Sequence, residues 1–505
     1  MSRWTFEELM RATEGEALRG APGGEAWSGV SIDSRTVSSG QVFLCLRGDR
    51  TDGHEYIDAA LAAGAGALIV ERGAPRVGAL PEGARFVVAV DDGLVALQNL
   101  ARFHRARLTN TLILGVTGSN GKTSTKEMLV TMAGHLLGPE KVFATPGNLN
   151  NHIGLPLSVL GIDTTTELAV LEMGMNHAGE IALLSNIARP HHALITSVSG
   201  AHREFFDTVE DIARAKLEIT VGLENEGTVV FHLYSPGGEL ALDLIRRRRS
   251  PRHGHRLKLV FFGGWPDSGG SMKPWPFVSE SLDSLLWDNR LSMIEHVQIT
   301  KDGLRFGWQG THVECPAYFT FEMAENLLGA LTLLEATGRF FPDQLREAAA
   351  HARPLTGRRF EVVQGRSDGR VGLLVDDSYN ANPAAFIASL RALRELLPSG
   401  RLAVFAGEMA ELGDSARADH RQVGEFAAAQ GYDLFVGCGV DHARSMQEAF
   451  AARSTKGRSL VKGSASALVD TLFDVLGDGH YDGVLVKGSR SARMDLVSDA
   501  LRENF

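Results

Sequence analysis

Residues Leu112–Thr125 read LILGVTGSNGKTST, a short apolar run that leads into a glycine-rich turn and then into residues of helical character. Gly118 and Gly121 lie in the turn, and Lys122 and Thr123 follow it directly. A buried strand that feeds such a turn at the start of a helix directs several backbone N–H groups toward one point, where they bind anions. The segment therefore predicts a phosphate cradle at the carboxyl end of a strand.

The glycine spacing differs from that of the standard phosphate-binding loop, which has a glycine where this chain has Val116. The alternative is an unliganded glycine-rich turn, which is common in α/β folds. The Gly-Lys-Thr sequence and the following helix favour nucleotide binding, with Lys122 reaching the terminal phosphates and the Thr123 hydroxyl holding Mg²⁺. The predicted nucleotide-binding residues of the loop are Thr117, Gly118, Ser119, Asn120, Gly121, Lys122, Thr123 and Ser124.

Length and composition limit the classes to which the chain can belong. A chain of 505 residues exceeds what one hydrophobic core organises, so we expect three domains. A hydrophobic content of 44% with 22% charged residues is typical of a globular protein. The formal net charge of −10 argues against a general nucleic-acid binder. The basic run Arg246–Arg249 is interpreted as a solvated loop or helix end.

The cysteines and the apolar segments bear on location. Cys45, Cys315 and Cys438 are widely separated, so they form no metal-ligand spacing and suit a reducing compartment. The first twenty residues contain no apolar core of signal-peptide length. No segment offers the roughly 18 uninterrupted apolar residues of a membrane span. We therefore expect a cytoplasmic protein without membrane insertion.

From Asn110 onward strand and helix patterns alternate, which predicts a mostly parallel sheet with helices on both faces. A smaller α/β unit is expected before this sheet, and a Rossmann-like unit after a linker at Leu355–Arg359. Residues 234–315 are expected to form short antiparallel strands and loops that decorate the central domain. The predicted fold class is α/β with three domains, at 1–107, 108–353 and 354–505. The expected central strands are Leu112–Val116, Glu167–Met173, Ala193–Val198 and Gly227–Phe231.

Polar side chains follow these expected strands at their carboxyl ends, where parallel sheets bind ligands. Glu172 ends an apolar strand, and a buried charge there is costly unless it is paired or bound to a metal. Metal ligation and a plain strand-end carboxylate are the two interpretations. His202 follows the strand Ala193–Val198 and is consistent with a ligand or with a surface histidine. Late in the chain, Lys487–Arg490 forms a basic turn at another strand end.

Other candidates also allow two interpretations. Lys216 lies on a predicted helix, and the residue pattern alone gives it no function because helical lysines are usually solvated. Asn148, Asn150 and Asn151 form a run of amides that suits a polar ligand or a bare loop. The cluster Asp33-Ser34-Arg35, taken alone, indicates a turn.

Seven segments together resemble the Mur ligase family, and an eighth resembles its UDP-binding domain. The similarity covers the three expected domains except about 234–325. The segments are GVTGSNGKTSTKEML (115–129), TPGNLNNHIGLPLSVL (145–160), LEMGMNHAGEI (171–181), AHREFFDTVEDIARAKLEI (201–219), DDSYNANP (376–383), GEMAELGDSARADHRQVGE (407–425), VKGSRSARM (486–494) and the amino-terminal stretch 32–71.

The resemblance implies an ATP-dependent ligase that joins D-alanyl-D-alanine to a UDP-muramoyl tripeptide in peptidoglycan precursor synthesis. ATP would phosphorylate the peptide carboxylate, and the amine would attack the acyl phosphate to give the amide, ADP and phosphate. Lys122 and Mg²⁺ would neutralise the charge that builds up in phosphoryl transfer. Both substrates are small molecules, and we expect a monomer without nucleic-acid or membrane partners.

The resemblance also assigns roles to single residues. Thr123 and Glu172 match ligands of one Mg²⁺, and His202 serves a second ion with Glu172. Lys216 matches a lysine that is carbamylated and so becomes an oxygen ligand. Domain closure would complete the site and exclude water from the acyl phosphate. The implied catalytic residues are Lys122, Glu172, His202, Lys216 and Arg358; further nucleotide contacts are Asn326, Arg358 and Asp377; substrate contacts are Ser34, Arg35, Asn148, Asn150, Asn151, His177, Tyr379, Asn380, Lys487 and Arg490.

The chain departs from the family pattern in three places. An Asn-x-x-Asn element is replaced by Glu322–Asn326, in which Asn326 would take over the adenine contact. The leucine after the metal-site histidine is Arg203, and an Asn-Asp turn is replaced by His232–Ser235. These changes leave open a related ligase that joins a different carboxylate and amine. A non-catalytic nucleotide-binding scaffold is the other alternative, although the intact set of catalytic residues argues against it.

Overall fold

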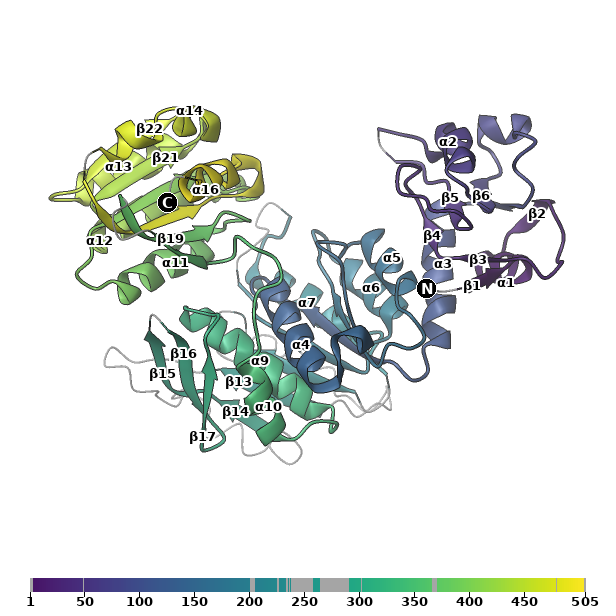
Figure 1. Cartoon of the computed structure of the whole chain (residues 1–505), viewed down its shortest axis with the longest axis horizontal. Helices are drawn as coiled ribbons and strands as arrows, with labels where there is room; N and C mark the ends of the chain where they lie inside the picture. The colour runs from purple at the N-terminus through teal and green to yellow at the C-terminus, as the bar shows by residue number, and fades with distance from the viewer. Residues whose placement is uncertain are drawn as a thin grey trace.

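The chain forms three α/β units, with the amino-terminal and carboxy-terminal units at opposite ends of a central one (Figure 1). The computed structural model describes residues 3–48, 50–199, 205–224, 227–232, 235, 237, 258–263, 290–300, 302–365, 370–477 and 479–503. Parallel sheets flanked by helices confirm the predicted fold class. None of the helices within these residues is long and apolar enough to cross a membrane.

The amino-terminal unit is a mixed sheet of order β2-β7-β6-β5-β4, in which β2 pairs antiparallel and the others pair parallel. A separate pair joins β1 to β3. The first helix begins with a capping box, because Thr5 Oγ1 accepts the Glu8 N–H and the Glu8 carboxylate accepts the Thr5 N–H. The elements are β1 Arg3–Thr5, α1 Phe6–Thr13, β2 Glu16–Arg19, β3 Ala26–Ser28, β4 Val30–Ser31, β5 Val42–Leu44, α2 Ile57–Ala62, β6 Ala67–Glu71, β7 Val87–Val90 and α3 Gly93–Arg107.

The central unit is built on a parallel sheet of order β14-β13-β12-β11-β8-β10-β9. Its inner strands are continuous apolar runs buried on both faces, as parallel strands require. The elements are β8 Leu112–Thr117, α4 Lys122–Leu137, β9 Val142–Ala144, α5 Gly154–Leu160, β10 Leu168–Glu172, α6 Glu180–Ala188, β11 His192–Ile195, α7 Val209–Leu217, β12 Thr228–His232, β13 Lys258–Gly263, β14 Arg290–Met293, α9 Phe321–Ala336 and α10 Pro342–Ala349.

Alternate residues of these strands enter two cores on the two faces of the central sheet. One core contains Ile113 and Leu171 with the helices α3, α5, α6 and α7. The other contains Leu114 and Val170 with α4, α9 and α10. Strand β8 lies between β10 and β11, and the strand order reverses there, because β9 and β10 lie on one side of β8 and β11 to β14 lie on the other. Such a switch point opens a crevice beyond the carboxyl ends of the strands.

The prediction for residues 234–315 was correct in part. A three-stranded antiparallel sheet is present, formed by β15 Glu295–Thr300, β16 Gly303–Trp308 and β17 Thr311–Cys315. However, β13 and β14 are not decoration, because they extend the central sheet by parallel pairing. The sequence of β13, KLVFFG, is an apolar run of the kind that parallel sheets bury, but its Gly-, Pro- and Ser-rich flanks favoured the loop interpretation.

The carboxy-terminal unit has the sheet order β18-β19-β23-β20-β21-β22, parallel except for β18. Strand β18 lies directly after the predicted linker. The last helix begins at Asp495, shortly after Arg493, which adopts a left-handed φ of 54°. The elements are β18 Glu361–Gln364, β19 Val371–Asp377, α11 Pro383–Leu396, β20 Leu402–Gly407, α12 Ala416–Ala429, β21 Leu434–Cys438, α13 Ala443–Arg453, β22 Arg458–Lys462, α14 Ala465–Val469, α15 Leu472–Leu476, β23 Tyr481–Lys487 and α16 Asp495–Arg502.

Candidate active site

The glycine-rich loop connects β8 to α4 at the switch point of the central sheet, and the end of β11 braces it. The Ser119 N–H donates to the Ser197 carbonyl at 2.8 Å, and the Asn120 N–H donates to Ser197 Oγ at 3.0 Å. Thr196 Oγ1 donates to the Asn120 carbonyl at 2.5 Å. These bonds fix the loop before any ligand binds, which lowers the cost of ordering it around phosphate.

Gly121 is the position at which the loop requires glycine. Its φ is 82°, and it is the N-cap of α4, directly before Lys122. A Cβ atom there would lie 2.3 Å from Asn326 Oδ1, so a side chain at residue 121 would collide with α9. The same contact places Asn326 beside the loop, where a nucleotide contact was predicted for it.

Lys122 curls back over the loop that precedes it. Its Nζ donates to the carbonyls of Gly118 at 2.8 Å and Ser119 at 3.3 Å. Burial lowers the pKa of this ammonium, and the nearby Glu172 carboxylate opposes that change. A bound phosphate would supply the anion that this desolvated cation lacks.

Glu172 is the centre of a buried polar cluster at the end of β10. Thr123 Oγ1 donates to its carboxylate at 3.0 Å, and Asn150 Nδ2 donates at 2.9 Å. The Lys126 ammonium lies 3.5 Å from Glu172 Oε2 and also donates to the carbonyls of Thr145 and Gly147 at 3.0 and 3.1 Å. Lys126 was missed by the sequence analysis. The available signal was a second lysine one helical turn after Lys122, although helical lysines are usually solvated.

Lys216 lies on α7 and is completely buried. Its Nζ makes no hydrogen bond to any described residue. Burial lowers its pKa well below the ordinary value of 10.5, and the charge of Lys122 lowers it further. Among the described residues the amine is therefore unpaired, and it interacts electrostatically with Lys122 of the phosphate loop.

The predicted metal site is described only in part. His202 lies outside the described residues, and no cluster of three or more His, Cys, Asp or Glu side chains that could hold a metal occurs within the described part. The donors that are described are a hydroxyl and a carboxylate, on Thr123 and Glu172, and both suit a hard cation such as Mg²⁺. Lys216 would also offer an oxygen donor to Mg²⁺ if its amine carried an added carboxylate.

A second cluster forms at the ends of β19 and β23. Lys487 Nζ donates to Asp377 Oδ2 at 2.5 Å and to the Asn380 carbonyl at 3.2 Å. Arg490 lies over the Tyr379 ring at 5.5 Å. The structure thus brings five predicted residues together, although none was predicted to contact another. Asn382, also missed, donates a hydrogen bond from Nδ2 to Asn120 Oδ1 and so joins this cluster to the phosphate loop.

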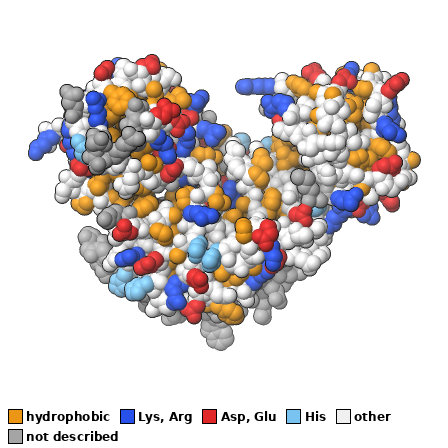
Figure 2. Space-filling model, viewed as in Figure 1, with side chains coloured by type: hydrophobic (Ala, Val, Ile, Leu, Met, Phe, Trp, Pro, Cys, Tyr) orange, Lys and Arg blue, Asp and Glu red, His pale blue; other side chains and the backbone are white. Residues whose placement is uncertain are grey.

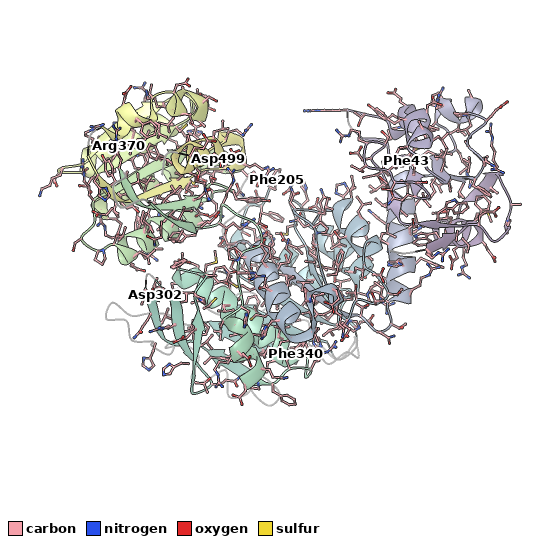
Figure 3. The ribbon with its side chains drawn as sticks, in the orientation of Figure 1. Phe43, Phe205, Asp302, Phe340, Arg370 and Asp499 are labelled. Atoms are coloured by element: carbon pink, nitrogen blue, oxygen red, sulfur yellow. The ribbon has the colours of Figure 1, made fainter. Side chains whose placement is uncertain are left out.

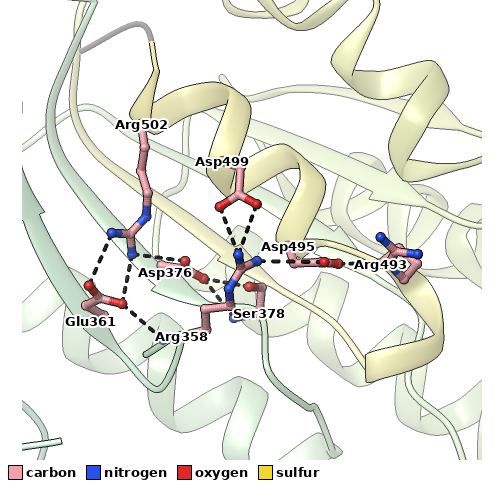
Figure 4. Close-up of polar contacts among 8 residues, drawn as sticks. All are labelled: Arg358, Glu361, Asp376, Ser378, Arg493, Asp495, Asp499 and Arg502. Carbon is pink, nitrogen blue, oxygen red and sulfur yellow. Dashed lines mark hydrogen bonds and ion pairs between the residues drawn. The ribbon is translucent and has the colours of Figure 1, made fainter. Parts of the chain in front are cut away.

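Arg358, which precedes β18, belongs to a different network, and its carboxylate partners lie on the carboxy-terminal helix α16. Its Nη2 donates to both carboxylate oxygens of Asp499 at 2.9 Å, and its Nη1 lies 3.8 Å from Asp495 (Figure 4). Arg502 extends the network through Glu361 and the buried Asp376. The predicted nucleotide contact is therefore engaged by carboxylates of its own unit; Asp499 marks this helix in Figure 3.

The remaining predicted residues have local partners. Asn151 Oδ1 accepts the N–H of Gly154, the first residue of α5, at 2.8 Å, and Asn148 is exposed. His177 is exposed and packs on Phe205, with ring centroids 5.1 Å apart; Phe205 lies on the side of the central unit that faces the carboxy-terminal unit (Figure 3). Arg35 is exposed beside Ser34 and lowers the pKa of Asp33 to about 2. Asp33 lines a hollow of about 290 Å³.

A larger hollow of about 660 Å³ opens at the carboxyl ends of β20, β21 and β22. Glu408 organises its wall, because Oε1 accepts the N–H groups of Asp441, His442 and Ala443 at 2.8, 2.5 and 2.8 Å. Ser489 donates to the Glu408 carbonyl through both N–H and Oγ. Arg493 also lines the hollow, whereas the predicted Arg490 is not among its lining residues.

Two of the departures from the family pattern contact each other. His232 Nε2 lies 3.0 Å from Glu325 Oε1, joining the end of β12 to α9. Both side chains are largely buried, with 8% and 16% exposure. Neither residue type follows the family pattern at its position, and in the structure the two side chains contact each other.

This pair predicts coupled effects of mutation. Removing one partner strands the other in a mostly buried position, so His232→Ala and Glu325→Ala should each lower the free energy of unfolding by about 1–3 kcal/mol. The double variant should cost less than the sum, by about 0.5 kcal/mol or more. Urea unfolding of the four proteins measures this coupling, and additive effects would contradict a direct interaction.

Comparison with known proteins agrees with this geometry. Three family profiles match the chain: the Mur ligase family, catalytic domain, at 27–105; the Mur ligase middle domain at 116–250; and the Mur ligase, glutamate ligase domain, at 358–490. The UDP-N-acetylmuramoyl-tripeptide–D-alanyl-D-alanine ligase of Escherichia coli is 31% identical over 507 residues, covering 99% of this chain and 98% of that protein. The Bacillus subtilis ligase of the same name is 33% identical, covering 78% of this chain and 76% of that one.

Solved structures give the same result. MurF from Thermotoga maritima in complex with ADP is 28% identical, with a TM-score of 0.70 and coverage of 94% of this chain and 97% of that one. MurF from Acinetobacter baumannii has a TM-score of 0.80 at 24% identity, covers 99% of each chain and supports the fold. On these profiles and full-length relatives, the chain belongs to the Mur ligase family and is an ATP-dependent ligase.

Proposed function

We propose that this ligase joins D-alanyl-D-alanine to the terminal carboxylate of a UDP-N-acetylmuramoyl tripeptide, with release of ADP and phosphate. The observation that carries the proposal is the hydrogen bond from Asn382 to Asn120, which joins the phosphate loop to the polar cluster of the carboxy-terminal unit. An acyl-phosphate ligase needs the transferred phosphate and the attacking amine within reach of one carboxylate. We also propose that the domain boundaries lie between residues 107 and 108 and between residues 353 and 354.

Each end of the reaction has residues suited to it. Lys122 would pair with the terminal phosphates of ATP and stabilise the charge that develops as the carboxylate takes the phosphoryl group. Thr123 and Glu172, with His202 implied by resemblance, would hold Mg²⁺, which supplies further neutralisation of phosphate charge. Asn150 orients the Glu172 carboxylate through its hydrogen bond.

The 660 Å³ hollow is the proposed site of the amine substrate. It lies at the carboxyl ends of parallel strands, where such sheets bind ligands. The Arg493 guanidinium on its lining suits the dipeptide carboxylate. The attacking amine forms the C–N bond, the acyl–phosphate bond breaks, and the amine proton leaves with phosphate or solvent.

Lys216 is the proposed site of carbamylation. A neutral amine adds to CO₂ to give a carbamate and a proton, and the lowered pKa keeps the amine of Lys216 neutral more readily than an exposed lysine. The product carries a carboxylate where the described chain offers the amine no partner. A cytoplasmic location is also proposed, and it is supported by three cysteines that are all buried and unpaired.

The proposal is tested by phosphate release from ATP with a panel of UDP-muramoyl peptides, each with and without D-alanyl-D-alanine. We expect release only with the tripeptide and the dipeptide together. Turnover with a different carboxylate and amine would establish the related ligase instead. Absence of turnover with every muramoyl peptide, by enzyme that unfolds cooperatively, would refute the proposal.

A further inference from the structure

The segment that leads from the central unit to the carboxy-terminal unit is bonded to the helix that starts at the phosphate loop. Glu127 on α4 accepts the Leu355 N–H at 3.1 Å through Oε2 and the Thr356 N–H at 3.1 Å through Oε1, and it also accepts the Thr356 hydroxyl. One turn further along α4, Thr131 Oγ1 accepts the Arg353 N–H at 3.4 Å. Pro354 has no N–H. Every N–H group from 353 to 356 therefore donates to α4.

Before Gly357 the linker is hydrogen-bonded to α4 of the central unit, and after it the chain is hydrogen-bonded to the carboxy-terminal unit. Beyond Gly357, the Arg358 carbonyl accepts the Tyr379 N–H at 3.1 Å, and the Phe360 N–H donates to Asp377 Oδ1 at 3.1 Å. The Arg358 side chain is held by α16 (Figure 4). Arg358 and Phe360 have left-handed φ values of 68° and 53°, which non-glycine residues adopt only where surrounding structure holds them.

Glu127 itself needs an explanation, because it is a carboxylate only 2% exposed on a helix. The linker satisfies this carboxylate, because two linker N–H groups and one hydroxyl donate to its two oxygens. A buried carboxylate that lost these donors would pay its desolvation cost in full. The Glu127 carboxylate thus favours the conformation in which the linker lies against α4.

We propose that Gly357 is the pivot of domain closure and that Glu127 is a positioning residue that fixes the near side of this pivot to α4. Because Lys122 and Thr123 begin α4, the same rigid helix carries both the phosphate loop and the pivot. The carboxy-terminal unit then swings from a point that is fixed relative to the phosphates, which keeps the closed geometry reproducible. The catalytic consequence rests on the proposed function; the location of the pivot does not.

Amide hydrogen exchange on the full chain tests the anchor without reference to turnover. In the wild type, the amides of Leu355 and Thr356 should exchange as slowly as those of α4, and the Gly357 amide should exchange faster. Glu127→Gln keeps the shape but replaces one acceptor oxygen by an NH₂ group, so exchange at 355 and 356 should rise about tenfold or more. Thr356→Val should act in the same direction with a smaller effect. Glu140→Gln, at an exposed position near the end of α4, is the control and should change neither rate.

Kinetics and crystallography complete the test. Glu127→Gln should lower kcat about tenfold while the KM for ATP changes by less than about threefold, because the loop remains intact. Crystal structures with and without ATP and substrates should superimpose residues 353–356 on the central unit and residues 358–360 on the carboxy-terminal unit. Unchanged exchange at 355 and 356 in Glu127→Gln, or a bend located outside 356–358, would overturn the inference. Lack of muramoyl turnover in the wild type would refute the proposed function but would leave the exchange result intact.

Discussion

Replacing Lys216 with alanine is expected to lower the rate of amide formation by about two to three orders of magnitude, the size of effect seen when a charge-stabilising group is removed from an active site. The amine is completely buried and has no hydrogen-bond partner among the described residues, yet it is coupled to Lys122. A buried, unpaired amine at such a site is explained if it acts as a carbamate. Phosphate release at saturating substrates measures the loss.

Two further measurements separate the carbamate from a packing role. Acetate or propionate added to Lys216→Ala should restore part of the rate, because a small carboxylate fits the space that the side chain leaves. Wild-type enzyme in ¹³CO₂ should give a carbamate carbon resonance that Lys216→Met lacks. Arg214→Ala, an exposed position on the same helix, should stay within about twofold of the wild type. Wild-type activity in Lys216→Ala would refute the assignment.

Lys216 should also lower the free energy of unfolding relative to a variant with an uncharged side chain at this position. Its folded-state pKa lies below the unfolded value of 10.5, so the unfolded chain binds more protons and stability falls as the pH drops from that value toward the folded pKa. In CO₂-free buffer Lys216→Met should therefore melt at a higher temperature than the wild type, and the difference should widen as the pH is lowered. Activity and stability would move in opposite directions at this residue.

The sequence predicted the parallel sheets and the loop because both depend on local pattern. The apolar runs of β8, β10 and β11 are long enough to identify. The glycine-rich motif marked Gly121, whose φ of 82° and close approach to Asn326 require glycine. Strands β13 and β14 were not predicted as parts of the sheet. The apolar run of β13 is typical of a buried parallel strand, but its Gly-, Pro- and Ser-rich flanks favoured loops and antiparallel strands, and its pairing partners are distant along the chain.

The site was predictable as a set of residues but not as a set of contacts. Sequence pattern and resemblance identified Glu172 and Lys487, whereas their partners Lys126 and Asp377 could be matched to them only in three dimensions. Lys126 and Glu127 are adjacent charged helical residues, which pattern alone assigns to solvent, yet both are buried against carbonyls and amides of other segments. The pairing of His232 with Glu325 likewise joins positions that are far apart in sequence.

Replacing Lys122 with methionine is expected to reduce turnover by about a thousandfold or more, since methionine keeps the length of the side chain and removes the charge that faces the transferred phosphate. Folding should be largely unaffected. The ammonium is desolvated, and its hydrogen-bond partners are the Gly118 and Ser119 carbonyls. The nearby buried carboxylate of Glu172 keeps its contacts with Thr123, Asn150 and Lys126 when this charge is removed. Phosphate release measures turnover, and thermal unfolding verifies the fold.

The split between binding and chemistry distinguishes this role from a general effect on the loop. The backbone N–H groups of residues 118–121 remain in place, so ATP binding measured by calorimetry should weaken by about tenfold or less while kcat falls much further. Lys141→Met removes an exposed lysine that pairs with Glu167 at 2.9 Å and should change kcat by less than about twofold. Weaker ATP affinity with an unchanged kcat at saturating ATP would show instead that Lys122 contributes to ATP binding alone, with no additional stabilisation of the transition state.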